Sequence, residues 1–151
     1  MYLLDTDHLS IIQRQSGPEY GLLMTRMASC EPNDFCASII SFHEQVVGWN
    51  AYLNRAKSSE AIVRAYAMFQ RILADFSTMM IAPFDDLASR TFEFLRRSRI
   101  RIGTMDLRIA AIAMANDWTV LSRNLVDFEL VPNLRVEDWT TLAPSDGLGL
   151  G

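Results

Sequence analysis

The sequence is poor in the residues that build zinc sites and disulfide frameworks. It contains two cysteines and two histidines among 151 residues. The cysteines, Cys30 and Cys36, lack the second pair of ligands at matching spacing that a structural zinc site requires. We therefore expect two reduced thiols, as in a cytoplasmic protein, rather than a disulfide-stabilised secreted one.

Lysine is nearly absent, since Lys57 is the only one and every other basic residue is an arginine. The 14 basic residues stand against 18 acidic ones and give a net charge of −4. This balance argues against tight, salt-driven, nonspecific binding to nucleic acid. It does not exclude a nuclease, because metal ions can neutralise a cluster of carboxylates locally.

Long apolar runs are missing as well. Asp5 and Asp7 interrupt the early apolar segment, so we expect neither a signal peptide nor a membrane span. The length suits one domain with a sizeable core. We expect this domain over residues 1–142, followed by a flexible C-terminal tail over residues 143–151, where three glycines and a proline occur.

Short apolar runs alternate with longer segments of helical period along the chain. We expect strands over residues 2–4, 35–40, 79–82 and 118–122, and a short fifth strand over 134–136. Helices are expected over residues 8–15, 18–28, 41–56, 60–76, 85–99 and 103–116. Such alternation predicts an α/β fold: an α/β/α sandwich with a four- to five-stranded parallel sheet and right-handed crossovers.

The helix expected over residues 60–76 carries an apolar stripe whose members are spaced 4, 3, 4 and 3 residues apart. A stripe at helical period usually packs against a core. Alternatively, this helix and the preceding one form a projecting clamp with exposed apolar surface for a partner. The stripe consists of Ile62, Tyr66, Phe69, Leu73 and Phe76.

Four acidic residues, each at the edge of an apolar element, are candidates for a functional site. Asp106 lies in the first turn of a helix whose next residues are apolar on nearly every face, as in a buried helix. Taken alone, Asp106 suits the helix dipole, and Glu44 suits a capping box with Ser41. Because Asp5 and Asp127 follow predicted strands, we expect all four carboxylates at the carboxyl edge of the sheet, where open α/β sheets bind ligands.

A cluster of four carboxylates has a restricted set of chemical uses. The groups repel one another, which raises pKa values unless a cation compensates. Oxygen ligands suit Mg²⁺ or Mn²⁺, and such ions activate water and stabilise a phosphodiester during in-line displacement. The pattern therefore predicts metal-dependent phosphodiester hydrolysis. Neighbouring polar residues expected to orient ligands, water or phosphate are Thr6, Asp7, Ser122 and Asn124.

The two histidines do not form a metal site of their own. His43 and Glu44 begin like the helix of a zinc protease, but Val47 stands where the second histidine is required. His8 has no partner histidine either. We expect both histidines to serve packing or the polar rim of a site.

The segment after the first expected strand also suggests a different enzyme class. Asp5 and Asp7 are placed as in the nucleophile segment of phosphatases of the haloacid dehalogenase type. Those enzymes have a glycine after the second aspartate and use a later lysine. Here His8 follows Asp7, and Lys57 lies between two helices, so a small-molecule phosphatase is the weaker alternative.

An arginine cluster precedes Asp106. Cations are favourable at a helix C-terminus, so a solvated helix end is the default interpretation. The functional alternative is a rim that contacts phosphate, because these residues lead directly to Asp106. The cluster consists of Arg96, Arg97, Arg99 and Arg101.

Four blocks in this order resemble the PIN-domain ribonucleases, especially the VapC-type toxins of bacterial toxin–antitoxin systems. The resemblance covers nearly the whole chain, from Met1 to Trp139. The blocks are Tyr2-Leu3-Leu4-Asp5-Thr6-Asp7, Ser38-Ile39-Ile40-Ser41-Phe42-His43-Glu44-Gln45, Gly103-Thr104-Met105-Asp106-Leu107-Arg108-Ile109-Ala110-Ala111 and Ser122-Arg123-Asn124-Leu125-Val126-Asp127-Phe128.

The resemblance implies a metal-dependent endoribonuclease that binds Mg²⁺ or Mn²⁺ and acts on RNA. It also implies a homodimer and a small cognate antitoxin, whose C-terminal segment enters the site. The helix pair between Ser41 and Phe76 resembles the family's antitoxin-binding groove. The polar segment that follows the family's last strand falls on Ser122 and Asn124. The acidic site, carried over by position, consists of Asp5, Glu44, Asp106 and Asp127.

Two departures from the family pattern qualify this resemblance. Asp7 stands where many relatives have asparagine, which adds a carboxylate and leaves the number of metal ions open. His43 and Gln45 flank Glu44 where alanine and leucine are common, although the acid itself is retained. The chief alternative to an enzyme is a PIN-like binding or scaffolding module that keeps the acids without catalysis.

Overall fold

The computed structural model describes residues 1–142 and forms a five-stranded, all-parallel sheet in the order β3-β2-β1-β4-β5. The tail predicted over residues 143–151 lies outside the described residues. The predicted α/β class and the parallel sheet are confirmed. The strands are β1 (Tyr2–Leu4), β2 (Phe35–Ser38), β3 (Ile81–Ala82), β4 (Thr119–Leu121) and β5 (Arg135–Glu137).

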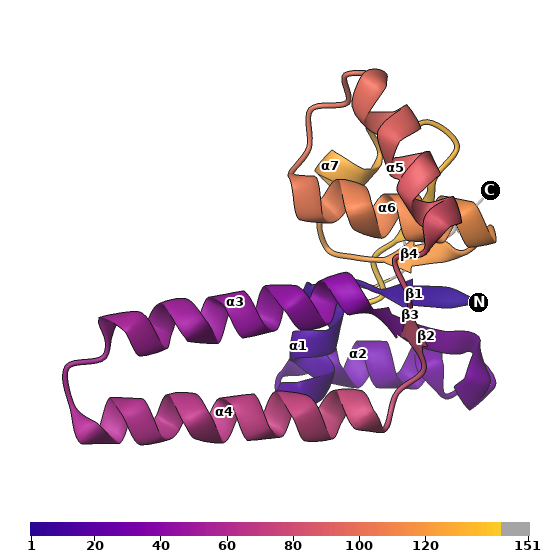
Figure 1. The fold of residues 1–151 in the computed structure, drawn as a ribbon. Coiled ribbons are helices and arrows are strands. Elements are labelled where there is room, and N and C mark those ends of the chain that lie inside the picture. Colours follow the sequence, from indigo (N-terminus) through magenta and orange to yellow (C-terminus); the bar gives the residue numbers. More distant parts are fainter. Residues whose placement is uncertain (143–151) are drawn as a thin grey trace.

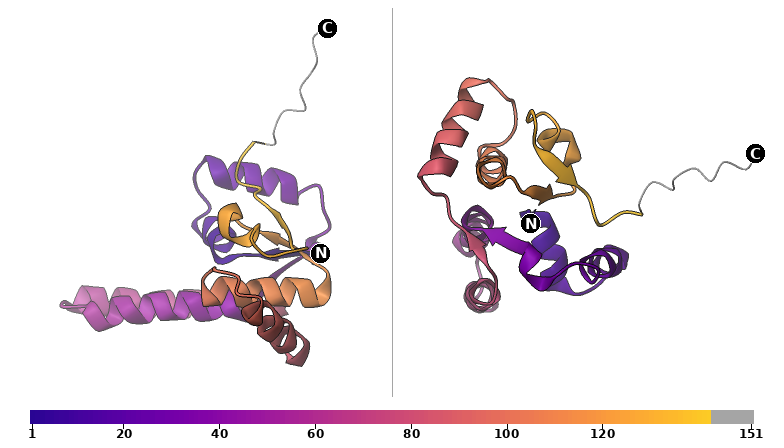
Figure 2. Two further views of the ribbon diagram at one scale, coloured as in Figure 1. Left: turned by 90° about the horizontal axis from the view of Figure 1, so that it is seen from above. Right: turned by 90° about the vertical axis from the view of Figure 1, so that its right-hand side faces the viewer.

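Helices cover both faces of the sheet, with α5 and α6 on one face and α1 and α2 on the other (Figure 1). Two long antiparallel helices, α3 and α4, extend well beyond the sheet, and we call them the α3–α4 hairpin (Figures 1 and 2). No helix of residues 1–142 is both long and apolar enough to cross a membrane. The helices are α1 (Thr6–Arg14), α2 (Pro18–Met27), α3 (Ile39–Arg55), α4 (Ser59–Ser77), α5 (Asp86–Arg97), α6 (Thr104–Asn116) and α7 (Leu125–Phe128), with a short 3-10 helix, η1 (Pro32–Asp34).

The alternation of side chains along the strands divides the core into two layers. Leu3 pairs with Cys36 and Val120 in register, and these residues face the layer under α5 and α6. Leu4, one residue later, belongs to the opposite layer with the helices α1 and α2. Both layers are closed to solvent, which fixes the register because a shift of one residue would exchange the two faces.

Helix α6 is buried, as its composition predicts. Residues 109–113 are fully inaccessible to solvent. The one cation inside the helix, Arg108, lies over the Phe92 ring of α5 at 5.6 Å from its centroid. The helix ends at Asn116, as expected, and Asp117 follows it in the left-handed conformation (φ 56°). Its burial holds the N-terminal turn, and thus Asp106, firmly against the sheet.

Helix α3 begins earlier than the sequence suggested. The apolar residues Ile39 and Ile40 are already helical, because the Ser38 hydroxyl accepts a hydrogen bond from the Ser41 amide at 3.0 Å and caps the helix. The predicted capping box of Ser41 and Glu44 is therefore wrong. Ser41 lies inside the first turn, and the Glu44 side chain is free to point elsewhere.

The apolar stripe on α4 is mostly exposed. Tyr66 is 58% and Leu73 66% exposed, whereas Phe76 is buried. The helix packs through Phe76 and through Ala65 and Ile72, which lie outside the stripe. Core packing was thus the wrong interpretation for most of the stripe, and the projecting hairpin with exposed apolar surface is the observed geometry. The partner remains a prediction.

The capping of α3 gives a test of the fold. Ser38→Ala should lower the free energy of unfolding by roughly 1–2 kcal/mol, because it removes the cap and leaves the buried Ser41 hydroxyl without its 3.2 Å partner. Ser58→Ala, at the exposed N-cap of α4, is the matched control and should cost less, about 0.5–1 kcal/mol. Urea denaturation measures both. Equal effects would contradict the assigned start of α3.

Candidate metal centre

The acidic residues gather at the carboxyl edge of the central strands. Asp5 follows β1, and its backbone amide donates to the Leu121 carbonyl at 3.0 Å, which continues the pairing of β1 with β4. Its side chain then caps α1 by accepting from the Thr6 amide at 2.7 Å. Strand pairing and helix capping together hold this carboxylate, which is only 6% exposed.

Three of the four predicted acids converge. Asp5, Glu44 and Asp106 each offer a carboxylate oxygen, and these three oxygens lie within 4.8 Å of one another. Glu44 comes from the second turn of α3 and Asp106 from the first turn of α6. We call these three residues the acidic centre. Oxygen-only donors at this separation fit a hard divalent cation such as Mg²⁺ or Mn²⁺.

The fourth predicted acid, Asp127, lies beside the centre and not within it. The Asn124 side-chain amide donates to the Asp127 carboxylate at 2.9 Å and to the Asp106 carboxylate at 3.3 Å. One amide group therefore sets the positions of both acids. The short helix α7, which the sequence did not predict, carries Asp127 in its single turn.

Three of the four predicted supporting residues, Thr6, Ser122 and Asn124, bind the acids directly. The Ser122 hydroxyl donates to Asp5 at 2.7 Å and accepts from the Asn124 amide at 3.0 Å. The Thr6 hydroxyl donates to Glu44 at 2.9 Å. These bonds orient carboxylates that would otherwise swing apart, which is the usual task of residues behind a metal ligand.

Asp7 lies outside the acidic centre and contacts its supporting residues. One of its oxygens accepts from the Arg123 amide at 2.9 Å and lies 3.4 Å from the Ser122 hydroxyl. Its other oxygen lies 2.8 Å from Nδ1 of His8. Asp7 is half-buried, and its contacts join the end of β1 to the segment after β4.

His8 is the residue whose place the sequence did not reveal. It is fully buried, and its Nε2 accepts from the Trp139 amide at 3.3 Å. Because Nε2 accepts, Nδ1 carries the proton that is donated to Asp7. No spacing in the sequence linked His8 with Trp139, which follows 131 residues later. His43, in contrast, is exposed.

The electrostatics of the centre favour a cation. Burial, followed by the nearby charge of Asp7, raises the pKa of Asp5 to about 7. Burial also raises the pKa of Glu44, and burial with the charge of Asp127 raises that of Asp106. Within residues 1–142, no arginine or lysine forms an ion pair with these three acids. A divalent cation held by these oxygens would supply the missing positive charge.

The arginine cluster lies at the end of α5 and in the loop that leads to α6. Arg96 is paired with Glu93 at 2.7 Å. Arg97, Arg99 and Arg101 are exposed. The predicted contact of this cluster with phosphate remains a prediction.

Solved structures share this fold. FitAcB from Neisseria gonorrhoeae is 24% identical, with a TM-score of 0.68 over 94% of this chain and 100% of that one. DNA-bound VapBC from Salmonella typhimurium is 23% identical, with a TM-score of 0.66 over 91% and 97% of the two chains. A toxin–antitoxin complex from Klebsiella pneumoniae is 21% identical, with a TM-score of 0.64 over 92% and 98%.

Comparison of the amino-acid sequence alone does not identify a relative. No protein-family model matches the chain, and no curated protein matches it. At the identities of the solved structures, the likeness establishes the fold. The PIN-like α/β/α sandwich expected from the four sequence blocks is thereby confirmed.

The raised pKa of Asp5 predicts how stability depends on pH without metal. The folded state holds this proton up to pH 7, whereas the unfolded chain releases it near the ordinary value of 3.8. The protonated Asp5 therefore makes its full contribution to the stability of the folded state below pH 4, and this contribution is lost as pH rises to about 7. Asp5→Asn removes this loss, so in EDTA its stability relative to wild type should rise by up to about 4 kcal/mol between pH 4 and pH 8.

Urea denaturation of both proteins at these two pH values measures the effect. Mg²⁺ at millimolar concentration should reverse the order at pH 8, because it stabilises the folded wild type by binding to it. Asp86→Asn, at an exposed acid in the first turn of α5, is the control and should show neither change. A pH-independent difference between Asp5→Asn and wild type would contradict the assignment.

Proposed function

We propose that the protein is a Mg²⁺- or Mn²⁺-dependent endoribonuclease and the toxin of a type II toxin–antitoxin pair. The observation that carries this proposal is the acidic centre, with three carboxylate oxygens within 4.8 Å at the carboxyl edge of the sheet. The same fold in FitAcB and VapBC structures supports it. The basic count is too low for binding RNA by charge alone, so the ion supplies local attraction for a phosphate.

In this proposal Asp5, Glu44 and Asp106 hold the ion, and Asp127 completes the site directly or through water. When bound, the ion supplies an activated water and stabilises charge on the phosphodiester. Ser122 and Thr6 keep the carboxylates of Asp5 and Glu44 turned toward the centre.

A protein partner follows from the same assignment. The solved structures of similar fold include a toxin–antitoxin complex and a DNA-bound VapBC. We assign the antitoxin to the α3–α4 hairpin, because Val63, Tyr66 and Leu73 expose apolar surface there. A homodimer is part of the same proposal.

The alternative is a binding or scaffolding module with the same fold. Such a module could retain the acidic centre and bind Mg²⁺ without hydrolysing RNA. Metal binding alone therefore does not distinguish the two, and strand cleavage does.

Cleavage of a labelled single-stranded RNA should require Mg²⁺ or Mn²⁺ and stop in EDTA. Asp106→Asn should lower the rate by more than ~100-fold, because loss of a ligand exceeds the ~10–100-fold typical of residues behind the ligands. Ser122→Ala should lower the rate by only ~10–100-fold, since the Ser122 hydroxyl orients Asp5 from behind. Sequencing gels with a matching DNA strand measure rate and RNA preference.

Asp86→Asn again serves as the matched control and should cleave like wild type. Equal cleavage by wild type, by Asp106→Asn and in EDTA would reveal a contaminating ribonuclease. Mg²⁺ binding without cleavage of any RNA tested would favour the binding module.

A further inference from the structure

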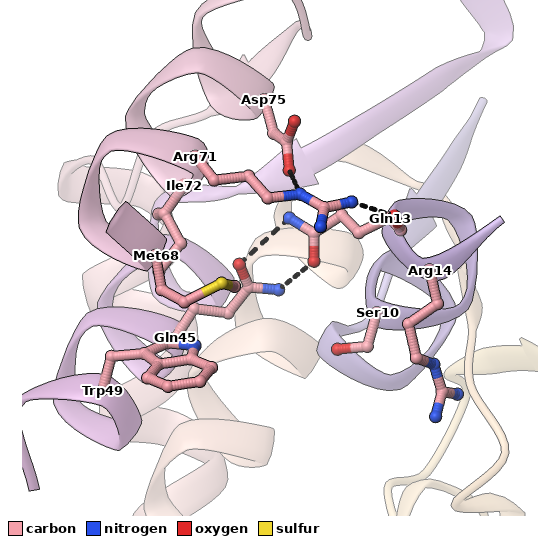
Figure 3. Close-up of a pocket in the computed structure, with 9 residues that line it drawn as sticks. All are labelled: Ser10, Gln13, Arg14, Gln45, Trp49, Met68, Arg71, Ile72 and Asp75. Atoms are coloured by element: carbon pink, nitrogen blue, oxygen red, sulfur yellow. Dashed lines mark hydrogen bonds and ion pairs between the residues drawn. The ribbon is translucent and has the colours of Figure 1, made fainter. Parts of the chain in front are cut away.

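A pocket opens between α1 on one side and the α3–α4 hairpin on the other (Figure 3). Its volume is about 220 Å³. Pockets for drug-sized ligands are larger, roughly 300–1,000 Å³. The space therefore suits a single planar ring system better than a larger molecule.

The pocket is linked to the acidic centre through both helices that border it. Ser10, in the pocket wall, donates to the Thr6 carbonyl at 2.8 Å, one turn back along α1. Thr6 in turn binds Glu44 at 2.9 Å, and Gln45 in the pocket directly follows Glu44. One helical turn spans about 5.4 Å, so a ligand at the centre and a group in the pocket can belong to the same polymer strand.

Two glutamine side chains form a polar wall with unused hydrogen-bonding capacity. Gln13 donates to Gln45 at 3.1 Å, and Gln45 donates back at 2.8 Å. Arg71 donates to the main-chain carbonyl of Gln13 and forms an ion pair with Asp75, which steadies this arrangement (Figure 3). A primary amide has two N–H groups and two acceptor lone pairs, so each glutamine keeps a donor and an acceptor for the edge of a base.

An aromatic ring and an arginine complete the pocket. Figure 3 shows Trp49 on one side and Arg14 on the other. The Trp49 ring packs in a T-shape against Tyr52, with the centroids 5.1 Å apart. In the described part of the chain, Arg14 forms no ion pair. A pocket that contains both an aromatic ring and an arginine without an ion-pair partner has the composition of sites that bind single-stranded nucleic acid.

We propose that this pocket binds one unstacked base of single-stranded RNA, adjacent to the phosphate at the acidic centre. Trp49 stacks on the base, the Gln13–Gln45 pair contacts its edge, and Arg14 contacts a neighbouring phosphate. The inference rests on the proposed function and adds a site of base selection to it. An apolar protein segment is a poorer occupant, because it would leave the paired amides and Arg14 unused.

Binding of RNAs that lack one base tests the proposal. The series carries one abasic position in each strand, and affinity is measured by fluorescence anisotropy with Asp106→Asn, which avoids turnover. One abasic position should weaken binding by roughly 5- to 150-fold, the range typical of one stacked base. Adding Trp49→Leu should cause a similar loss and make affinity insensitive to that position. Trp49→Phe should restore most of the difference.

Arg14→Ala provides a second variant at an exposed residue, with little effect on folding expected. It should weaken binding of every RNA and reduce the slope of log affinity against log salt by about 0.7, as for one phosphate contact on a single strand. The matched controls are Arg90→Ala, exposed on α5, and Trp118→Leu, packed under α6. Neither substitution should change how the affinity for RNA depends on the position of the abasic site.

The base pocket would be overturned if no abasic position weakened binding, or if Arg14→Ala left the affinity for RNA unchanged. If Trp49→Leu fails to fold, Trp49→Phe and Gln45→Leu provide the comparison. If wild type cleaves RNA but no abasic position weakens binding, the proposed ribonuclease stands and the base pocket does not. If one abasic position weakens binding but wild type cleaves no RNA, the pocket stands and the ribonuclease does not. RNA binding that ignores Trp49 while an antitoxin peptide requires it would assign the pocket to protein and overturn the proposal.

Discussion

Repulsion among one buried and two half-buried carboxylates is the constraint on which the rest of this structure depends. Asp5, Glu44 and Asp106 are held with oxygens within 4.8 Å of one another, and burial raises the pKa of each. The chain opposes this repulsion with hydroxyl and amide donors and with the fully buried body of α6. The fold thus supplies rigidity where residues 1–142 offer these acids no arginine or lysine as an ion-pair partner, and a bound cation would neutralise them.

Much of the fold could be predicted from periodicity and from the ends of strands. The parallel sheet, the buried helix α6 and the meeting of Asp5 with Glu44 and Asp106 all follow from local patterns, because parallel strands bring their carboxyl ends to one edge. The start of α3 did not follow, since Ile39 and Ile40 resemble strand residues until the Ser38 cap is known.

What the sequence could not provide depends on contacts between distant segments. The bond from Trp139 to His8, and the single amide by which Asn124 joins Asp106 to Asp127, require the folded chain. The stripe on α4 shows another limit. Helical period indicates that one face is apolar but not what covers it, and the hairpin carries much of that face beyond the sheet.

The order of the sheet also determines when the centre can exist. Strand β1 lies between β2 and β4, so the strand that leads to Asp5 gains its second neighbour only from residues 119–121. Ser122, Asn124 and Asp127 come later still. A ribosome makes the N-terminal residues first, so the growing chain carries the acids apart from one another until Asp106 and β4 have been made. Under the proposed function, the topology itself delays toxicity, because the messenger being translated is not exposed to an active enzyme until Ser122, Asn124 and Asp127 have been made.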